Sequence, residues 1–160
     1  MTRLLAVLLN PPLTSGVASL RHVEAARLAL ACDSVLIANL FSEPTRSVED
    51  INVIGKCPEG WTQSREQLLN ALDSADVLMG AWGISGLTGE AARMRKSQVA
   101  WLAQSAMDQG FDKLWTVGGT PRHPSRWHQY VSDKYQRAVG ETLELRLSSV
   151  LSTVDLADFT

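Results

Sequence analysis

The chain has 160 residues, of which 45% are hydrophobic and 20% charged, and its formal net charge is −2 at pH 7. This composition excludes a disordered chain, and no apolar run is long enough for a transmembrane helix. The slight negative charge argues against an extended surface that binds nucleic acid non-specifically, but it does not exclude a local basic patch. We expect one domain spanning residues 1–160, cytoplasmic and monomeric, with no membrane contact.

Near-continuous apolar runs at residues 4–9, 34–39, 75–81 and 113–118 predict four buried strands. Such runs are typical of parallel strands that are covered on both faces. Helical spacing of apolar residues predicts helices over 17–30, 65–74 and 89–110, the last ending at Gly110. Strands that alternate with helices predict an α/β domain with a mainly parallel sheet. The segment 42–63 has no clear pattern of apolar residues. We expect it to be either a functional loop or a long loop that covers part of the domain.

Metal and cofactor chemistry finds little support in the sequence. Cys32 and Cys57 have neither disulfide nor metal-site spacing, and the histidines at 22, 123 and 128 are scattered. We therefore expect no metal ion and no cofactor.

Polar and aromatic side chains follow each predicted strand, at the edge where ligands bind in open parallel sheets. The candidates are Asn10, Thr14 and Ser15 after the first strand, Asn39 and Phe41 after the second, Trp82 after the third, and Arg122, His123, Ser125, Arg126 and Trp127 after the fourth. Each has an ordinary structural reading: a turn asparagine, a helix start at His-Pro-Ser, a core tryptophan, a solvated arginine. Their shared position at successive strand ends favours a functional reading.

The residue types suggest nucleotide chemistry. Asn10 can orient a water molecule but cannot deprotonate it, and Asn39 offers the donor and acceptor needed to read the edge of a base. His123 can donate a hydrogen bond to an oxygen that gains charge as a bond breaks. Stacking faces are available from Phe41, Trp82 or Trp127, and phosphate contacts from Thr14, Ser15, Arg122, Ser125 and Arg126.

The order strand–Asn-Pro, strand–Asn, strand–His-Pro-Ser resembles the uracil-DNA glycosylase superfamily. "LLNPP" (8–12) is similar to the first motif of its mismatch-specific branch, "IANLF" (37–41) resembles the base-reading strand end, and "RHPSRW" (122–127) resembles the minor-groove loop. The motifs look most like a bacterial and phage-associated offshoot of that superfamily. The resemblance implies a three-layer α/β/α sandwich with a central, mainly parallel four-stranded sheet.

The resemblance also implies a mechanism on duplex DNA. A nucleotide is flipped out of the helix and its N-glycosidic bond is hydrolysed, leaving an abasic site. His123 would stabilise the departing base, Asn10 would hold the attacking water, and Arg126 or Trp127 would fill the vacated space. The chain departs from the family pattern at Pro12, where a glycine is usual, and at Arg126-Trp127, where Pro-Leu is usual. Asn10 in place of an aspartate removes a general base.

The motifs do not identify the base. The 42–63 segment and Gly83–Gly86 are expected to shape a roomy pocket, which would suit a base modified at C5, such as glucosylated hydroxymethylcytosine in phage DNA. Excision of that base would serve anti-phage defence, and excision of a damaged base would serve repair.

Two alternative functions stay open. One is a hydrolase of free nucleosides or nucleotides, which the absence of a strong wedge would favour. The other is an inactive nucleic-acid-binding module, against which Asn10, Asn39 and His123 argue together.

Overall fold

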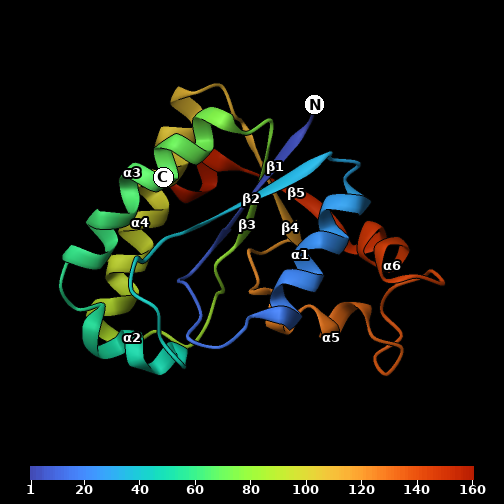
Figure 1. Ribbon diagram of the computed structural model, residues 1–160, viewed down its shortest axis with the longest axis horizontal. Coiled ribbons are helices and arrows are strands. Elements are labelled where there is room, and N and C mark those ends of the chain that lie inside the picture. The colour runs from blue at the N-terminus through green and yellow to red at the C-terminus, as the bar shows by residue number, and fades with distance from the viewer.

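A single sheet runs through the centre of the computed structural model, which describes residues 1–160 (Figure 1). Its strand order is β2-β1-β3-β4-β5, with β1–β2, β1–β3 and β3–β4 parallel and β4–β5 antiparallel. The strands are β1 (Arg3–Leu8), β2 (Ser34–Asn39), β3 (Val77–Ala81), β4 (Lys113–Val117) and β5 (Leu151–Asp155). The four predicted strands are confirmed, but the predicted count of four is one short. The sequence missed β5 because this edge strand is half exposed and carries Ser152, Thr153 and Asp155.

Six helices surround the sheet. They are α1 (Val17–Ala29), α2 (Val48–Ile54), α3 (Glu59–Ser74), α4 (Gly89–Asp108), α5 (His128–Val131) and α6 (Leu143–Val150), together with the 3₁₀ helices η1 (Pro124–Arg126) and η2 (Leu156–Phe159). The three predicted helices are confirmed as α1, α3 and α4, although α3 begins six residues earlier than expected, at Glu59 rather than Arg65. None of the helices combines the length and apolar character needed to cross a membrane.

The segment 42–63 is not irregular throughout, as the sequence suggested. It contains α2, which begins where the Asp50 carboxylate accepts a hydrogen bond from the Ser47 backbone N–H at 3.4 Å. It also contains the first turn of α3. The pattern was hard to detect because α2 is short and buries only Ile51 fully.

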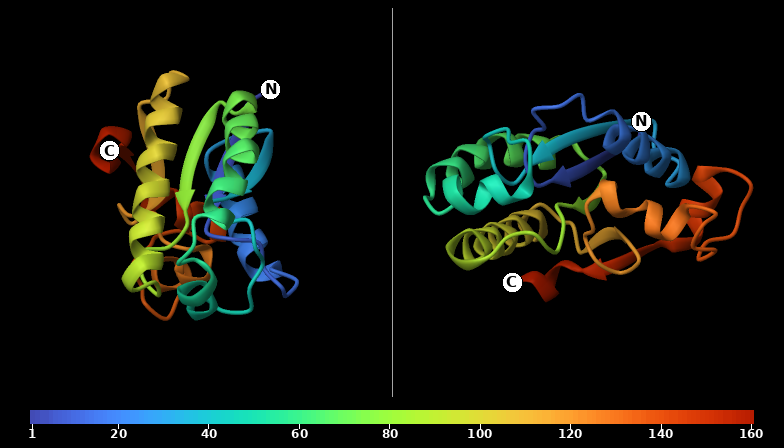
Figure 2. Two further views of the ribbon diagram at one scale, coloured as in Figure 1. Left: turned by 90° about the vertical axis from the view of Figure 1, so that its left-hand side faces the viewer. Right: turned by 90° about the horizontal axis from the view of Figure 1, so that it is seen from below.

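The helices pack on both faces of the sheet, as Figure 2 shows from two directions. Side chains of a strand point alternately to its two faces, so Leu5 and Val7 of β1 join the core beneath α3 and α4, whereas Leu4 and Ala6 join the core beneath α1, α5 and α6. The helix after β1 (α1) and the helix after β3 (α4) therefore cover opposite faces, although β1 and β3 are neighbours. This arrangement leaves a crevice between the carboxyl ends of β1 and β3, where ligands bind in sheets of this kind.

Helix α2 is held against the segment that follows β3. The Asn52 Nδ2 atom donates to the Gly86 carbonyl at 3.2 Å, and Asn52 Oδ1 accepts from the Thr88 N–H at 2.8 Å. Gly86 has φ +86°, and a Cβ at this position would lie 2.5 Å from Val48 Cγ1. Both the backbone conformation and the close approach of α2 therefore require glycine here.

Replacing Asn52 by alanine should loosen α2 from this segment. Two hydrogen bonds are lost, so the free energy of unfolding should fall by about 1–3 kcal/mol. Urea unfolding measures the change. Asn70→Ala is the matched control, because Asn70 is exposed on α3 and its side chain makes no hydrogen bond in the structure. Equal stability of the two variants would show that the Asn52 bridge does not hold α2 in place.

Candidate functional site

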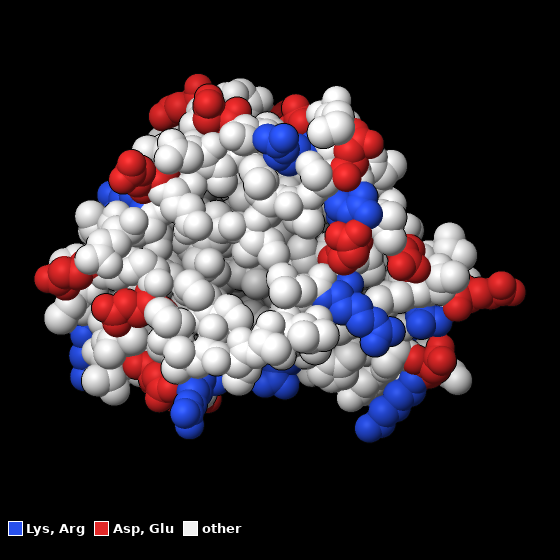
Figure 3. All heavy atoms as spheres, in the orientation of Figure 1, with Lys and Arg blue, Asp and Glu red and all other residues white.

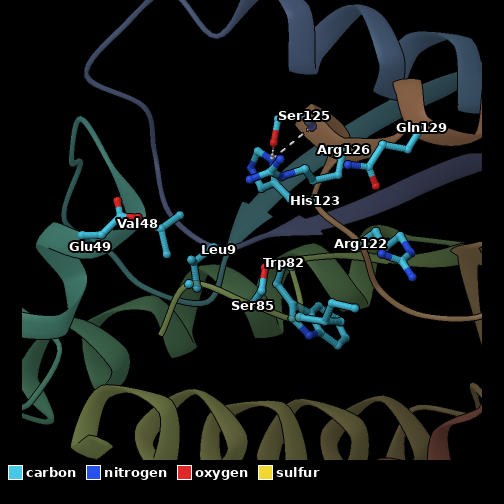
Figure 4. Close-up of a pocket in the computed structure, with 13 residues that line it drawn as sticks. Leu9, Val48, Glu49, Trp82, Ser85, Arg122, His123, Ser125, Arg126 and Gln129 are labelled. Carbon is cyan, nitrogen blue, oxygen red and sulfur yellow. Dashed lines mark hydrogen bonds between the residues drawn. The ribbon is translucent and has the colours of Figure 1, made fainter. Parts of the chain in front are cut away.

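A pocket of about 430 Å³ opens at the carboxyl ends of β1 and β3 (Figure 4). Its volume is in the range of pockets that enclose a small-molecule ligand. The face of the molecule in Figure 3 is hollowed near its middle, with uncharged atoms in the hollow and charged side chains mainly around the margin. The pocket is lined by Leu9 after β1, Val48 and Glu49 of α2, Trp82 to Gly86 after β3, and Arg122, His123, Ser125, Arg126 and Gln129 from the loop and helices after β4.

The His-Pro-Ser sequence fixes the orientation of the His123 ring. His123 is the N-cap of η1 and Pro124 occupies its first turn. The Ser125 backbone N–H donates to His123 Nδ1 at 3.2 Å, and Ser125 Oγ lies 2.9 Å from the same nitrogen. A backbone N–H can only donate, so Nδ1 must be unprotonated. The neutral ring therefore carries its proton on Nε2, which has no partner within the protein.

The surroundings of His123 keep the ring neutral. Burial lowers the pKa of His123 below its ordinary value of 6.5, and the nearby charge of Arg126 lowers it further. Protonation would also remove the acceptor that receives the Ser125 N–H. At neutral pH the side chain therefore presents a neutral N–H donor, which suits an oxygen that develops negative charge.

The arginines that line the pocket have no carboxylate partner. Neither Arg122 nor Arg126 takes part in an ion pair. The Arg122 guanidinium lies over the Tyr130 ring, 5.2 Å from its centroid, and its buried Nε has no hydrogen-bond partner. Two cationic side chains are thus available to a ligand on the same side of the pocket as His123.

The segment after β3 adds backbone donors that sequence reasoning did not identify. The N–H groups of Ile84, Ser85 and Gly86 make no hydrogen bond within the protein. Arg95 of α4 donates to the Ser85 carbonyl at 3.2 Å. Because a trans peptide directs its C=O and N–H in opposite directions, the Gly86 N–H points away from Arg95. Free N–H groups of this kind suit an anionic oxygen. The sequence gives no signal for Arg95, because it lies within an ordinary helical pattern.

Asn10 lies next to the pocket but does not line it. Its Nδ2 atom donates to the Glu43 carbonyl at 3.0 Å and to Thr45 Oγ1 at 2.8 Å, so it ties the loop after β1 to the loop after β2. Both amide hydrogens are used, whereas Oδ1 has no partner in the protein. The preceding residue, Leu9, lines the pocket.

The residues predicted after β2 are not brought into the pocket. Asn39 is two residues beyond Ile37, whose side chain packs on the α1 side of the sheet, so Asn39 points to that side as well. Leu9 and Trp82 belong to the core on the opposite side. Phe41 is fully buried and packs edge-on against Trp61, with ring centroids 4.8 Å apart. The expected stacking face of Phe41 is therefore part of the core.

Of the two candidate tryptophans, Trp82 lines the pocket and Trp127 does not. Trp127 is fully buried, and its Nε1 donates to the Arg122 carbonyl at 2.9 Å. The expectation that Trp127 contacts DNA is therefore wrong in this structure, because the ring fills the core beneath α1. Trp82 is 4% exposed, lines the pocket, and packs edge-on against Phe159.

The remaining predicted residues divide between the pocket and the surface. Ser125 and Arg126 are exposed and line the pocket, whereas Thr14 and Ser15 are exposed in the loop between β1 and α1, outside it. The structure contains no group of three or more His, Cys, Asp or Glu side chains that could hold a metal ion.

Replacing Arg126 by glutamine should raise the pKa of His123, because a nearby positive charge is removed. An NMR titration of the histidine ring protons measures this shift. Arg21→Gln is the matched control. Because Arg21 lowers the pKa of His22, this change should raise the pKa of His22 and leave that of His123 unchanged. An unchanged His123 pKa in Arg126→Gln would show that this charge does not act on the imidazole.

The comparisons with known proteins concern most of the chain. A family model described as "Protein of unknown function (DUF1643)" matches residues 2–125. No curated protein and no solved structure matches the chain. The matched range includes β1 to β4 and ends at Ser125, so it covers all of the pocket-lining residues except Arg126 and Gln129. The chain belongs to the DUF1643 family.

Proposed function

We propose that the protein is a DNA glycosylase that hydrolyses the N-glycosidic bond of a flipped nucleotide and leaves an abasic site. One observation carries the proposal: His123 presents a neutral Nε2–H beside a pocket at the carboxyl ends of β1 and β3. Cleavage of an N-glycosidic bond places negative charge on the departing base. A fixed neutral donor stabilises that charge more in the transition state than in the bound substrate.

The attacking water needs orientation more than deprotonation, because the sugar becomes a strongly electrophilic, oxocarbenium-like cation. Asn10 supports this role through its unpartnered Oδ1, which can accept a hydrogen bond from water. Glu49 is the sole carboxylate that lines the pocket, and it lies on the α2 side of the opening, across from His123 (Figure 4). A mechanism without a carboxylate base beside His123 relies mainly on stabilising the charge of the departing base.

Contacts to the DNA backbone fit the side of the pocket around η1. Arg122, Ser125 and Arg126 line it, and the free N–H groups of residues 84–86 lie after β3. Such groups position phosphates without reading sequence. Since Trp127 is buried, we propose that Arg126 is the side chain that fills the space left by the flipped nucleotide.

We further propose that the fold is the three-layer α/β/α sandwich of the uracil-DNA glycosylase superfamily, with β5 added at one edge, and that the protein acts as a cytoplasmic monomer. The base is proposed to be modified at C5, for example glucosylated hydroxymethylcytosine in phage DNA, in defence or in base excision. The pocket between α2 and η1 has room for a bulky substituent, which supports this proposal. Asn39 does not line this pocket, so we assign base recognition to other residues.

Hydrolysis of free nucleotides is the second candidate. The burial of Trp127 favours it, because an aromatic wedge for opening a duplex is absent from the loop after β4. The same His123 donor and the same arginines would serve a nucleotide that enters the pocket alone. The two candidates differ in whether a duplex or a free nucleotide is the faster substrate.

His123→Ala should slow base release by about 10²-fold or more, the scale seen when one oxyanion donor is removed. The measurement is single-turnover formation of abasic sites in duplexes that each carry one modified base. Asn70→Ala is the control, because Asn70 is exposed on α3, its side chain makes no hydrogen bond, and it does not line the pocket. Its rate should stay within a few-fold of the wild type.

The same experiment separates the candidates. Duplex DNA should react faster than the corresponding free nucleotide if the protein is a DNA glycosylase. The reverse order supports the nucleotide hydrolase. A wild-type rate in His123→Ala would remove this residue from the chemistry and reject both candidates as formulated.

A further inference from the structure

Glu49 is the only carboxylate among the residues that line the pocket. It lies in the first turn of α2 and is exposed. Its carboxylate makes no hydrogen bond and no ion pair within the protein. Figure 4 shows Val48 and Glu49 across the opening from His123, Arg122 and Arg126. The function proposed above gives this acidic side chain no role.

The two sides of the pocket therefore offer opposite hydrogen-bonding groups. Around η1, His123 Nε2–H and the guanidinium groups of Arg122 and Arg126 are donors. On α2, an ionised Glu49 is an acceptor only. Neither arginine pairs with Glu49, so neither side neutralises the other. A ligand that spans the pocket is bound best when its acceptor oxygens face η1 and its donor groups face α2.

The backbone that carries Glu49 is fixed before any ligand binds. Ile51, two residues further along α2, is fully buried. Val48 packs against Gly86, and Asn52 bridges α2 to Gly86 and Thr88. A preorganised wall discriminates between ligands better than a mobile loop, because binding does not have to order it.

We infer that Glu49 is a specificity-determining residue that favours bases carrying exocyclic hydrogen-bond donors, either an exocyclic amine or the hydroxyls of an attached sugar. This inference rests on the proposed function and names its substrate class. Uracil carries its hydrogen-bond donor on ring N3, and its exocyclic groups are carbonyls, so it would place an acceptor where cytosine places its exocyclic amine against the carboxylate. Two acceptors that face each other cannot form a hydrogen bond, and both remain unsatisfied, so such a base binds less well.

The test compares wild type, Glu49→Gln and Glu49→Ala on duplexes that contain a single cytosine, hydroxymethylcytosine, glucosylated hydroxymethylcytosine or uracil. The wild type should prefer bases with exocyclic donors to uracil, and both substitutions should reduce that preference in kcat/KM by about tenfold or more. A preference for cytosine over uracil assigns the effect to the amine. A preference confined to the glucosylated base assigns it to the sugar hydroxyls.

Glu59→Gln is the matched control. Glu59 occupies the first turn of α3, is exposed, and does not line the pocket. Its base preference should equal that of the wild type, and thermal melting should show all variants folded. An active Glu49→Gln enzyme with the wild-type preference would overturn the inference and leave the glycosylase proposal intact.

Binding provides a readout that does not depend on catalysis. In equilibrium binding of the 5′-monophosphates of the same four bases, the wild type should prefer the nucleotides with exocyclic donors to the uracil nucleotide. Glu49→Gln should show a smaller preference. If no duplex releases a base, the proposed function fails, and this measurement still decides the role of Glu49. Equal binding of all four nucleotides by the wild type would overturn the inference about Glu49.

Discussion

The hydrogen bond from the Ser125 N–H to His123 Nδ1 is the constraint on which the chemistry of this site depends. It forms because His-Pro-Ser begins η1, with the histidine as its N-cap and Pro124 in its first turn. The bond assigns the proton of the neutral ring to Nε2. Burial and the charge of Arg126 lower the pKa of His123, so the neutral form persists at physiological pH. A short local sequence thereby determines which atom of His123 can act on a ligand.

The sheet topology supplies the remaining parts from distant positions in the chain. Because α1 and α4 cover opposite faces, a crevice opens between β1 and β3, and the segment 83–86 lies at its edge. Helix α2 reaches the same edge through Asn52 and the close approach of Val48 to Gly86. The result is a pocket with donors around η1 and a single carboxylate on α2.

The sequence predicted the parts that depend on local pattern. Apolar runs identified β1 to β4, and the His-Pro-Ser motif placed His123, Ser125 and Arg126 at the pocket. It could not decide which face of the sheet a strand-end residue points to. Asn39 therefore points toward the α1 side and does not line the pocket, and Phe41 fills the core. Both positions depend on tertiary packing.

Trp127 shows the same limit for an aromatic residue in a loop. Its neighbours Ser125 and Arg126 are exposed, yet the η1 turn directs the indole ring into the core beneath α1. Arg95 and Glu49 were missed for the opposite reason. Each lies in a helix, Arg95 within an ordinary amphipathic pattern and Glu49 within a segment expected to be irregular, and only the folded chain brings them to the edge of the sheet.

The dependence of the single-turnover rate of base release on pH tests the central claim most directly. If His123 acts as a neutral N–H donor, the rate on a reactive duplex should be level above the ordinary histidine pKa of 6.5 and should fall only at lower pH, where the ring becomes protonated. A rate that falls as pH rises through the ordinary histidine range would show that the protonated ring is required. That result would contradict the role assigned to the Ser125–His123 hydrogen bond.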